Sequence, residues 1–308
     1  MDQPAIAGLI EQEPSFYTLN SGVILINIKG ELLMSSNPSN PKVILVVSDG
    51  MSYDAAVNGM GYLMHLVERK HASLYKVIGE LPTLSRPMYE TIHTGVPVSE
   101  HGIVSNGIIR RSKMVNIFEL AVKAGKTTAA AAYYWYSELY NRAPYDRIDD
   151  REVNDKTLLI QHGRFYTRDE YPDVELFATA GMLVRKYSPD YLLVHPSGMD
   201  YHGETFGSNT PEYRKTATRQ DSLLANLIPE WMEKGYTILF TGDHGVNADG
   251  MHGGTTPDVR HVPLFIIRPG VTGDGDPNKM VSMLQFAPTI CSLLSLPIPE
   301  TMKAVSLV

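Results

Sequence analysis

The chain has 308 residues, of which 43% are hydrophobic and 20% charged, so it has enough apolar material for a large core and too little charge for a disordered chain. Its formal net charge of −7 argues against a nucleic-acid scaffold, which normally carries a basic face. The single cysteine, Cys291, excludes an intrachain disulfide framework and any multi-cysteine zinc or iron–sulfur site, so a metal ion would have to be held by Asp, Glu and His.

The first 40 residues are predicted to be an extension, because residues 35–41 (SSNPSNP) have the composition of a linker. The apolar run 22–28 has no basic segment before it and no small-residue cleavage site after it, which argues against a secretory signal. No stretch approaches the roughly 20 apolar residues of a membrane span. We therefore expect a cytoplasmic protein with no membrane partner and no stable nucleic-acid partner, and a single compact domain over residues 41–308.

Within that domain, apolar runs alternate with helical patterns. The first run, 43–48 (VILVVS), is typical of a buried central strand in a parallel sheet. Further strands are predicted at 127–134, 191–195, 236–241 and 262–267, and helices at 51–69, 113–123, 174–187, 211–234 and 282–296. Segment 137–168 is polar, aromatic and irregular, and is interpreted as a small inserted cap. The alternation predicts an α/β fold with a mostly parallel sheet and helices on both faces.

Acidic side chains follow three of the predicted strands, and histidines lie near the last of them. In α/β sheets, ligands bind outside the carboxyl ends of the strands. Any one of these residues alone has a structural interpretation, such as a helix N-cap. Carboxylates gathered at one edge repel each other, and a divalent cation removes the cost of burying them. The set comprises Asp49, Asp200, Glu204, Asp243, His244 and His252.

Four carboxylates and two imidazoles without thiolates suit zinc or manganese. The set is too large for one tetrahedral ion and fits two divalent ions roughly 4 Å apart, an arrangement used in phosphoryl transfer. A covalent mechanism also needs a nucleophile. Ser85 precedes a predicted helix, where its hydroxyl either caps the helix or, close to a metal, becomes an accessible alkoxide. Thr83 is a competing candidate that spacing alone does not exclude.

Five segments then occur in a characteristic order, followed by the closing APTICSLLSLPIPETM. They are VSDG with Asp49, PTLSRPMYETIHTGVPVSEHGI with Ser85, DYHGETFG starting at Asp200, TGDHG with Asp243 and His244, and HGGTTPDVRHVPLF with His252. Together they resemble the alkaline phosphatase superfamily, and within it the type I phosphodiesterase/nucleotide pyrophosphatase branch. The resemblance implies an alkaline phosphatase-like catalytic domain over residues 41–308.

The resemblance also implies a role for each matching residue. Asp49, Asp243 and His244 would hold one metal ion, bridged to the Ser85 oxygen. Asp200, Glu204 and His252 would hold the other. Ser85 would attack phosphorus to form a phospho-enzyme, which water then hydrolyses. The two divalent ions would be zinc, as is usual in the family, with manganese as the alternative.

Two positions depart from the family pattern. Glu204 stands where the branch usually has the histidine of a DxxxH pair, and His202 is the alternative third ligand. Met88 stands where many members carry an asparagine that donates to a phosphoryl oxygen, so Arg86 or Tyr89 is expected to bind the substrate instead. The aromatic run 133–136, with Tyr140 and Tyr145, is interpreted as core packing rather than as the wall of a pocket.

We therefore expect a metal-dependent phosphoric ester hydrolase that acts on a small phosphate ester or phosphonate. A phosphomonoesterase or phosphonate hydrolase of the same superfamily is one alternative. A degenerate member that binds a ligand without turnover is another.

Overall fold

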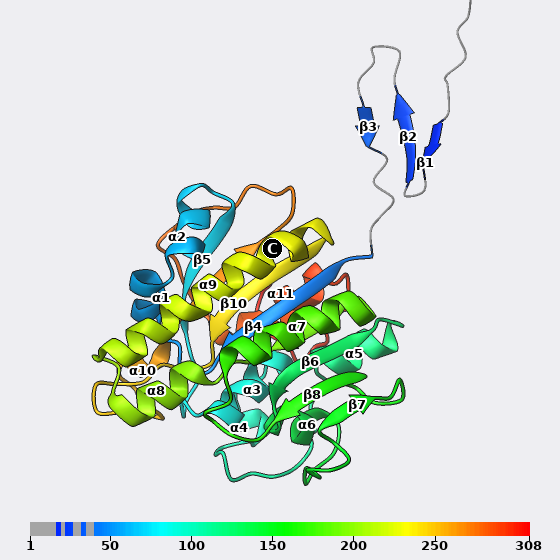
Figure 1. Ribbon diagram of the computed structural model, residues 1–308. Helices are drawn as coiled ribbons and strands as arrows, with labels where there is room; N and C mark the ends of the chain where they lie inside the picture. Colours follow the sequence, from blue (N-terminus) through cyan, green and yellow to red (C-terminus); the bar gives the residue numbers. More distant parts are fainter. Residues whose placement is uncertain (1–16, 20–21, 27–31, 35–39) are drawn as a thin grey trace, which may run out of the picture. The chain divides into compact units, whose positions relative to one another are not determined.

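The computed structural model describes residues 17–19, 22–26, 32–34 and 40–308 (Figure 1). The chain divides into two compact units, Met1–Asn40 and Pro41–Val308. In the first unit, β1 (Tyr17–Leu19), β2 (Gly22–Ile26) and β3 (Leu32–Met34) form an antiparallel sheet in that order. Most of the predicted linker, residues 35–39, lies outside the described residues.

The second unit is built on a nine-stranded sheet with the order β12-β5-β11-β10-β4-β9-β6-β8-β7. Five neighbouring strands, β10-β4-β9-β6-β8, run parallel, whereas β11 and β7 are antiparallel to their neighbours. The predicted mostly parallel α/β sheet is thereby confirmed. The strands are β4 (Lys42–Ser48), β5 (Ala72–Ile78), β6 (Thr128–Tyr133), β7 (Glu152–Asn154), β8 (His162–Tyr166), β9 (Tyr191–Val194), β10 (Tyr236–Gly242), β11 (His261–Ile267) and β12 (Met280–Ser282).

Helices cover both faces of this sheet. One face carries α1 (Tyr53–Gly59), α2 (Gly61–Glu68), α7 (Asp173–Tyr187) and α9 (Pro211–Glu233), and Figure 1 shows α7 and α9 lying across it. The other face carries α3 (Ser85–Thr94), α5 (Ile117–Lys123), α6 (Trp135–Tyr140) and α11 (Phe286–Leu293). The remaining helices are α4 (Val98–His101), α8 (Gly198–Phe206), α10 (Pro257–Arg260) and the 3-10 turn Met283–Gln285. No helix of the described residues is long and apolar enough to cross a membrane.

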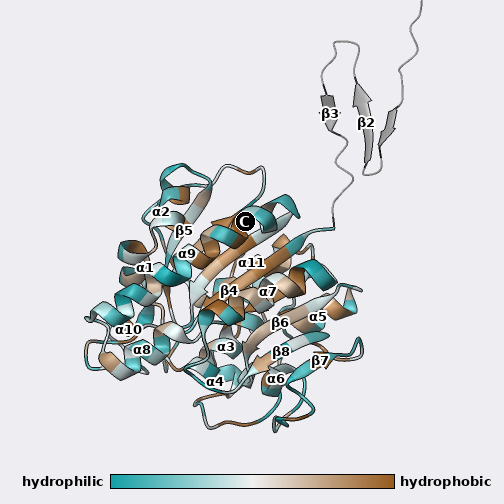
Figure 2. Cartoon of the chain, in the orientation of Figure 1, coloured by the Kyte–Doolittle hydropathy of each residue, from teal (hydrophilic) through white to brown (hydrophobic). Residues whose placement is uncertain are grey.

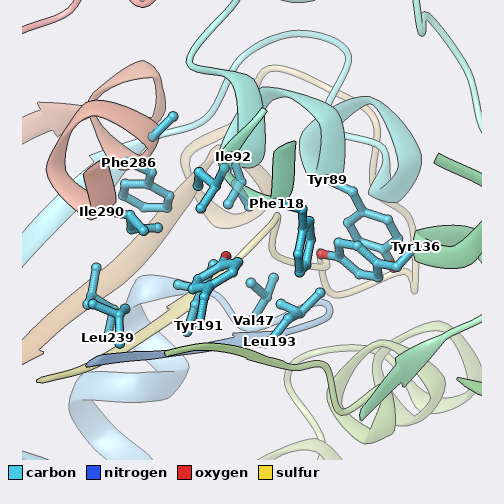
Figure 3. Close-up of a cluster of buried hydrophobic side chains, with 14 of the residues drawn as sticks. Val47, Tyr89, Ile92, Phe118, Tyr136, Tyr191, Leu193, Leu239, Phe286 and Ile290 are labelled. Carbon is cyan, nitrogen blue, oxygen red and sulfur yellow. The ribbon is translucent and has the colours of Figure 1, made fainter. Parts of the chain in front are cut away.

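The central strand β4 separates two hydrophobic clusters because successive side chains point to opposite faces. Val43, Leu45 and Val47 join the cluster beneath α3, α5 and α11, while Ile44 and Val46 join the cluster beneath α7 and α9. Figure 2 shows β4 as hydrophobic over most of its length, and Figure 3 shows Val47 among the rings and aliphatic side chains of the first cluster. Each fully buried large apolar side chain contributes roughly 1.5–3 kcal/mol, so this strand is fixed from both sides.

The structure differs from the sequence-based expectation in several segments, beyond β5, α8 and β12, which the sequence analysis did not predict. The predicted helix 51–69 is two helices that break at Met60, because both carboxylate oxygens of Asp221 on α9 accept hydrogen bonds from the backbone N–H groups of Tyr62 and Leu63 at the start of α2. Segment 137–168 is not only a cap, since it supplies β7 and β8 to the sheet. The predicted helix 282–296 shortens to α11, preceded by the 3-10 turn.

Candidate active site and metal centre

Two of the predicted acidic residues lie side by side, directly after the carboxyl ends of neighbouring strands. Strands β4 and β10 pair in parallel with Ser48 opposite Gly242, so Asp49 and Asp243 follow at the same level. Both side chains are buried. The N–H of Gly50 donates to Asp243 Oδ1 at 3.1 Å, which ties the two strand ends together.

Asp200 reaches the same place from the first turn of α8, which follows β9. Its approach depends on Gly50, whose φ is +74° and whose position leaves no room for a side chain. A Cβ atom there would lie 2.6 Å from Asp200 Cα, far inside van der Waals contact. Glycine is therefore required where the end of β4 meets α8. Glu204 follows one turn later on α8, with its carboxylate half-exposed.

His244 and His252 stack face to face, with ring centroids 4.0 Å apart and planes inclined by 7°. Nδ1 of His244 lies 3.1 Å from the carbonyl of Gly245, and Nδ1 of His252 lies 3.1 Å from the carbonyl of Thr83. A carbonyl only accepts, so each Nδ1 donates a proton to it, which leaves Nε2 as the ring nitrogen that could bind a metal ion. These Nε2 atoms face the carboxylates: His244 lies 3.2 Å from Asp49 and 3.3 Å from Asp243, and His252 lies 3.0 Å from Glu204.

Ser85 is the first residue of α3, and its hydroxyl lies 3.1 Å from Nε2 of His244. The N-cap of this helix is Leu84, so the Ser85 hydroxyl does not cap it. The competing hydroxyl, Thr83 Oγ1, accepts from the N–H of Gly253 and donates to the carbonyl of Gly254. Thr83 thus fixes the loop that carries His252, whereas Ser85 faces the carboxylates and histidines.

The electrostatics of the cluster favour bound cations. Burial raises the pKa of Asp200 and of Asp243, and the Asp49 carboxylate raises both further. Burial alone would also raise the pKa of Asp49, but hydrogen bonds with His195 and His244 hold it well below its usual range. Burial lowers the pKa of His244, but the carboxylates of Asp243 and Asp49 outweigh this effect and raise the pKa to about 10. Positive charge at this position is therefore stabilised.

The residues present fit a metal centre. One group that could hold an ion is Asp49, Asp243 and His244, and another is Asp200, His244 and His252. Within the described part of the chain, one buried carboxylate oxygen each on Asp49, Asp200 and Asp243 has no well-formed hydrogen bond and faces an imidazole nitrogen, at 3.2, 3.8 and 3.3 Å respectively. Burying carboxylates that are so poorly satisfied costs free energy that a divalent cation would offset. Oxygen and nitrogen donors without thiolate suit zinc or manganese.

The two alternatives for the third ligand of the second ion lie in different places. The Glu204 carboxylate contacts His252, as described above. The Nδ1 of His202 instead lies 2.7 Å from the carbonyl of Gly198, and its ring stacks on Phe206. His202 lines a neighbouring cavity together with Asp169 and Lys215. Glu204 is therefore the better placed of the two.

The residues expected to bind substrate are engaged inside the protein. Arg86 is 1% exposed, pairs with Glu138 at 2.7 Å, and stacks over the ring of Trp135. The hydroxyl of Tyr89 donates to Asp49 Oδ2, and its ring stacks on Tyr136 with centroids 4.3 Å apart (Figure 3). Met88 packs in the hydrophobic core. In this arrangement, Arg86 and Tyr89 support helix α3 and the Asp49 carboxylate.

Two residues of the site were missed by the sequence analysis. His195, immediately after β9, is fully buried and places Nε2 3.3 Å from Asp49 Oδ2. Asn106 accepts a hydrogen bond from the backbone N–H of Arg86 at 3.0 Å, which brings its side-chain amide next to Ser85. The sequence did contain an indication of His195, because this residue comes at the end of a predicted buried strand, much as Asp49 does. Asn106 lies in a loop 21 residues beyond Ser85, where no local pattern marks it.

Buried carboxylates, imidazoles and a serine hydroxyl lie at the carboxyl edge of a mostly parallel α/β sheet, and solved structures that include an alkaline phosphatase share this fold. Residues 43–249 match the profile of the type I phosphodiesterase / nucleotide pyrophosphatase family. The chain belongs to that family.

Among curated proteins, the catalytic subunit of human GPI ethanolamine phosphate transferase 2 is 23% identical over 288 residues, covering 85% of this chain and 27% of the relative. The 2,3-bisphosphoglycerate-independent phosphoglycerate mutase of Haloquadratum walsbyi is 29% identical over 203 residues, covering 62% of this chain and 39% of the relative. This chain thus spans about a quarter to two fifths of the length of these relatives.

Among solved structures, murine ectonucleotide pyrophosphatase / phosphodiesterase 5 in complex with AMP superposes with a TM-score of 0.65 at 13% identity. The superposition covers 84% of this chain and 96% of that one. The alkaline phosphatase PafA gives a TM-score of 0.61 at 12% identity, with coverages of 87% and 98%. At these identities, the likeness concerns the fold.

Proposed function

We propose that this protein hydrolyses small phosphate diesters, with Ser85 as the nucleophile. The observation that carries the proposal is the position of the Ser85 hydroxyl. It lies at the start of α3, 3.1 Å from His244, beside buried carboxylate oxygens that lack hydrogen bonds. A phosphate group bound there would meet the electropositive N-terminal end of α3.

The reaction is an exchange in two steps. The Ser85 oxygen bonds to phosphorus as the bond to the leaving alcohol breaks, and the serine proton departs with the alcohol. Water then adds to phosphorus, the bond to Ser85 breaks, and the hydroxyl is restored. Tyr89 and His195 hold the Asp49 carboxylate in place during both steps, because they bind Asp49 Oδ2.

Asn106 supplies the amide donor that Met88 lacks. Its Oδ1 atom accepts from the N–H of Arg86, which leaves the NH₂ group of the side chain available to a phosphoryl oxygen. Because Asn106 binds the residue that follows Ser85, the donor and the nucleophile are positioned by the same turn of chain.

The cofactor is proposed to be a pair of divalent ions, with zinc favoured and manganese as the alternative. Asp49, Asp243, His244 and Ser85 would hold one ion, and Asp200, Glu204 and His252 the other. When bound, the ions would lower the pKa of the attacking hydroxyl and neutralise phosphoryl oxygens. Glu204 in place of an imidazole makes the second set richer in oxygen, which moves its preference towards manganese.

The test is turnover of a chromogenic phosphodiester by metal-loaded protein. Ser85→Ala is expected to lower kcat by at least about a thousandfold while the metal content, measured by element analysis, changes little. Chelation is expected to abolish turnover, which returns with zinc or manganese. Ser137→Ala is the matched control, because that hydroxyl is also buried and makes no hydrogen bond in the described part of the chain. Equal rates for Ser85→Ala and the unaltered protein would refute the proposal.

Product analysis in the same assay separates the alternatives. The curated relatives include ethanolamine phosphate transferases, which makes transfer to an alcohol instead of water the second candidate. A transferase yields a new ester when an acceptor alcohol is added, whereas a hydrolase yields only the phosphate monoester. Parallel assays with phosphate monoesters and phosphonates rank these substrates, and metal-dependent binding without product would indicate a degenerate member.

Cytoplasmic location and the absence of membrane and nucleic-acid partners stay predictions.

A further inference from the structure

A second charged cavity lies beside the sheet, away from the catalytic residues. It has a volume of about 690 Å³ and lies between β8, the segment 145–152 and α7. Its lining includes five cationic side chains and a single carboxylate, Glu152, although the chain as a whole carries a net charge of −7. The cations are Arg147, Arg151, Arg164, Arg168 and Lys186.

The cationic charge of this cavity is only partly neutralised by the protein. Arg168 pairs with Glu170, and Arg164 bonds to two backbone carbonyls and lies 3.8 Å from Glu152. Arg147 and Arg151 are exposed, and within the described residues their side chains make no hydrogen bond or ion pair. Neighbouring arginines outside the cavity are different: Arg142 lies within 4.0 Å of three aspartates, and Arg185 pairs with Glu230.

Four aromatic side chains form part of the remaining wall of the cavity. Tyr166 and Tyr171 stack with centroids 4.9 Å apart, and Tyr145 lies on the same lining with its hydroxyl buried and without a hydrogen bond among the described residues. Such a surface binds the flat or apolar face of a ring, while guanidinium groups bind phosphate or sulfate oxygens in pairs. The volume is typical of a small-molecule site.

The cavity is connected to the catalytic site but distinct from it. Strand β8 is three strands away from β4, about 14 Å by the usual spacing of strands in a sheet. The Tyr166 hydroxyl donates to the carbonyl of His195, whose ring contacts Asp49. None of the five cations belongs to the set around Ser85.

We propose that this cavity binds a small polyanion that carries at least two phosphate or sulfate groups on a ring. Guanidinium groups of Arg147 and Arg151, which lack protein partners, bind the anionic groups, and the tyrosines pack against the ring. The ligand is either a free molecule or the headgroup of a lipid, since both present the same chemistry. This site is independent of hydrolysis at Ser85.

The first experiment measures binding of myo-inositol hexasulfate to the metal-loaded full chain by isothermal titration. Its sulfate esters contain no phosphorus and are small enough for the cavity. We expect binding that weakens as ionic strength rises from about 0.05 to 0.3 M. The double variant Arg147→Gln/Arg151→Gln is expected to weaken binding about tenfold or more, because charge-assisted hydrogen bonds are lost.

Two further variants make the result specific. Arg147→Lys/Arg151→Lys keeps the charge but loses paired hydrogen bonds, and is expected to bind with intermediate affinity. Arg69→Gln/Lys113→Gln removes two exposed charges from other parts of the surface and is expected to bind as the unaltered chain does. Turnover of a small chromogenic diester should be the same in all of them, so failure of catalysis and failure of this site are separable.

A second arm identifies the source of the anion. Ser85→Ala protein is sedimented with phosphatidylcholine vesicles that contain a phosphoinositide, with and without the Arg147→Gln/Arg151→Gln change. Sedimentation that depends on the two arginines assigns the site to a lipid headgroup, and binding of the free sulfate alone assigns it to a soluble ligand. If neither probe binds, or if both bind the arginine variant as well as its parent, the proposal is wrong.

Discussion

Three imidazole rings around the buried carboxylates of the candidate site are held in place by other parts of the protein. Nδ1 of His244 and of His252 each bind a backbone carbonyl, and Nδ1 of His195 lies 3.1 Å from the Tyr166 hydroxyl. In each ring Nε2 is directed at the carboxylates. Partners of this kind fix the ring and its tautomer, so little ordering is left to occur when metal or substrate binds. The rings of His244 and His252 thus owe their positions to the backbone.

Gly50 is the residue on which the geometry of the acidic cluster most depends. Gly50→Ala forces a Cβ against Asp200 Cα and is expected to displace Asp200, lowering the metal content and turnover together. Gly125→Ala is the matched control, since Gly125 has the same φ of +74° but nothing within 4 Å of its Cβ position. In urea unfolding, Gly125→Ala should lower the free energy of unfolding by about 1 kcal/mol because of backbone strain. Gly50→Ala should lower it by at least about 2 kcal/mol more. Equal behaviour of the two variants would contradict the role given to Gly50.

At the scale of elements, the sequence predicted those whose apolar pattern is regular. Runs such as 43–48 and 236–241 lie in β4 and β10, and therefore the acidic residues after them could be placed at one edge of the sheet. Strand β8 (HGRFY) was not predicted, because its histidine, glycine and arginine do not form an apolar run. Its position depends on pairing with β6. Asn106 acts through a contact between distant segments, which no local pattern contains. His195 ends a predicted strand, but its role depends on its contact with Asp49 from another strand.

Helix α3 carries a buried glutamate whose charge opposes folding at neutral pH. Burial raises the pKa of Glu90 from 4.5 to about 7, against hydrogen bonds from Ser112 and Tyr140 that lower it. Between these two values the native state holds a proton that the unfolded chain has lost. The contribution of this group to stability therefore falls as pH rises from about 4.5 to 7, and above pH 7 the full cost, about 3 kcal/mol, is present.

Glu90→Gln should remove this dependence. The free energy of unfolding of the variant minus that of the unaltered protein is expected to increase by about 2–3 kcal/mol as pH rises from 5 to 8. Urea unfolding at both pH values measures it. Glu68→Gln on the exposed end of α2 controls for the change in net charge. An unchanged difference in unfolding free energy between the two pH values would show that Glu90 is already charged in the native protein below pH 5.

In the whole molecule, a single sheet organises two chemically different surfaces. The carboxyl ends of β4, β9 and β10 gather acidic residues and histidines that fit cations, whereas the cavity beside β8 gathers arginines that fit anions. The net charge of −7 is therefore a poor guide to the local charge at either site. The acidity belongs in part to the proposed metal ligands, and the proposed polyanion would meet a locally positive surface at the cavity. Total charge alone could not have predicted this division, because it arises from strand order.

Every catalytic residue proposed here, and both hydrophobic clusters, lie within residues 41–308. A chain that begins at Asn40 is therefore expected to fold cooperatively, to melt within about 2 °C of the full chain, and to keep its turnover of a chromogenic diester, because it retains every strand of the nine-stranded sheet and both clusters. Thermal unfolding of both chains with metal bound is the measurement, and a truncation two residues into β4, beginning at Ile44, is the control that should fail to fold. If the shorter chain melted many degrees lower, or lost activity while remaining folded, residues 1–40 would have to contribute to the catalytic unit itself.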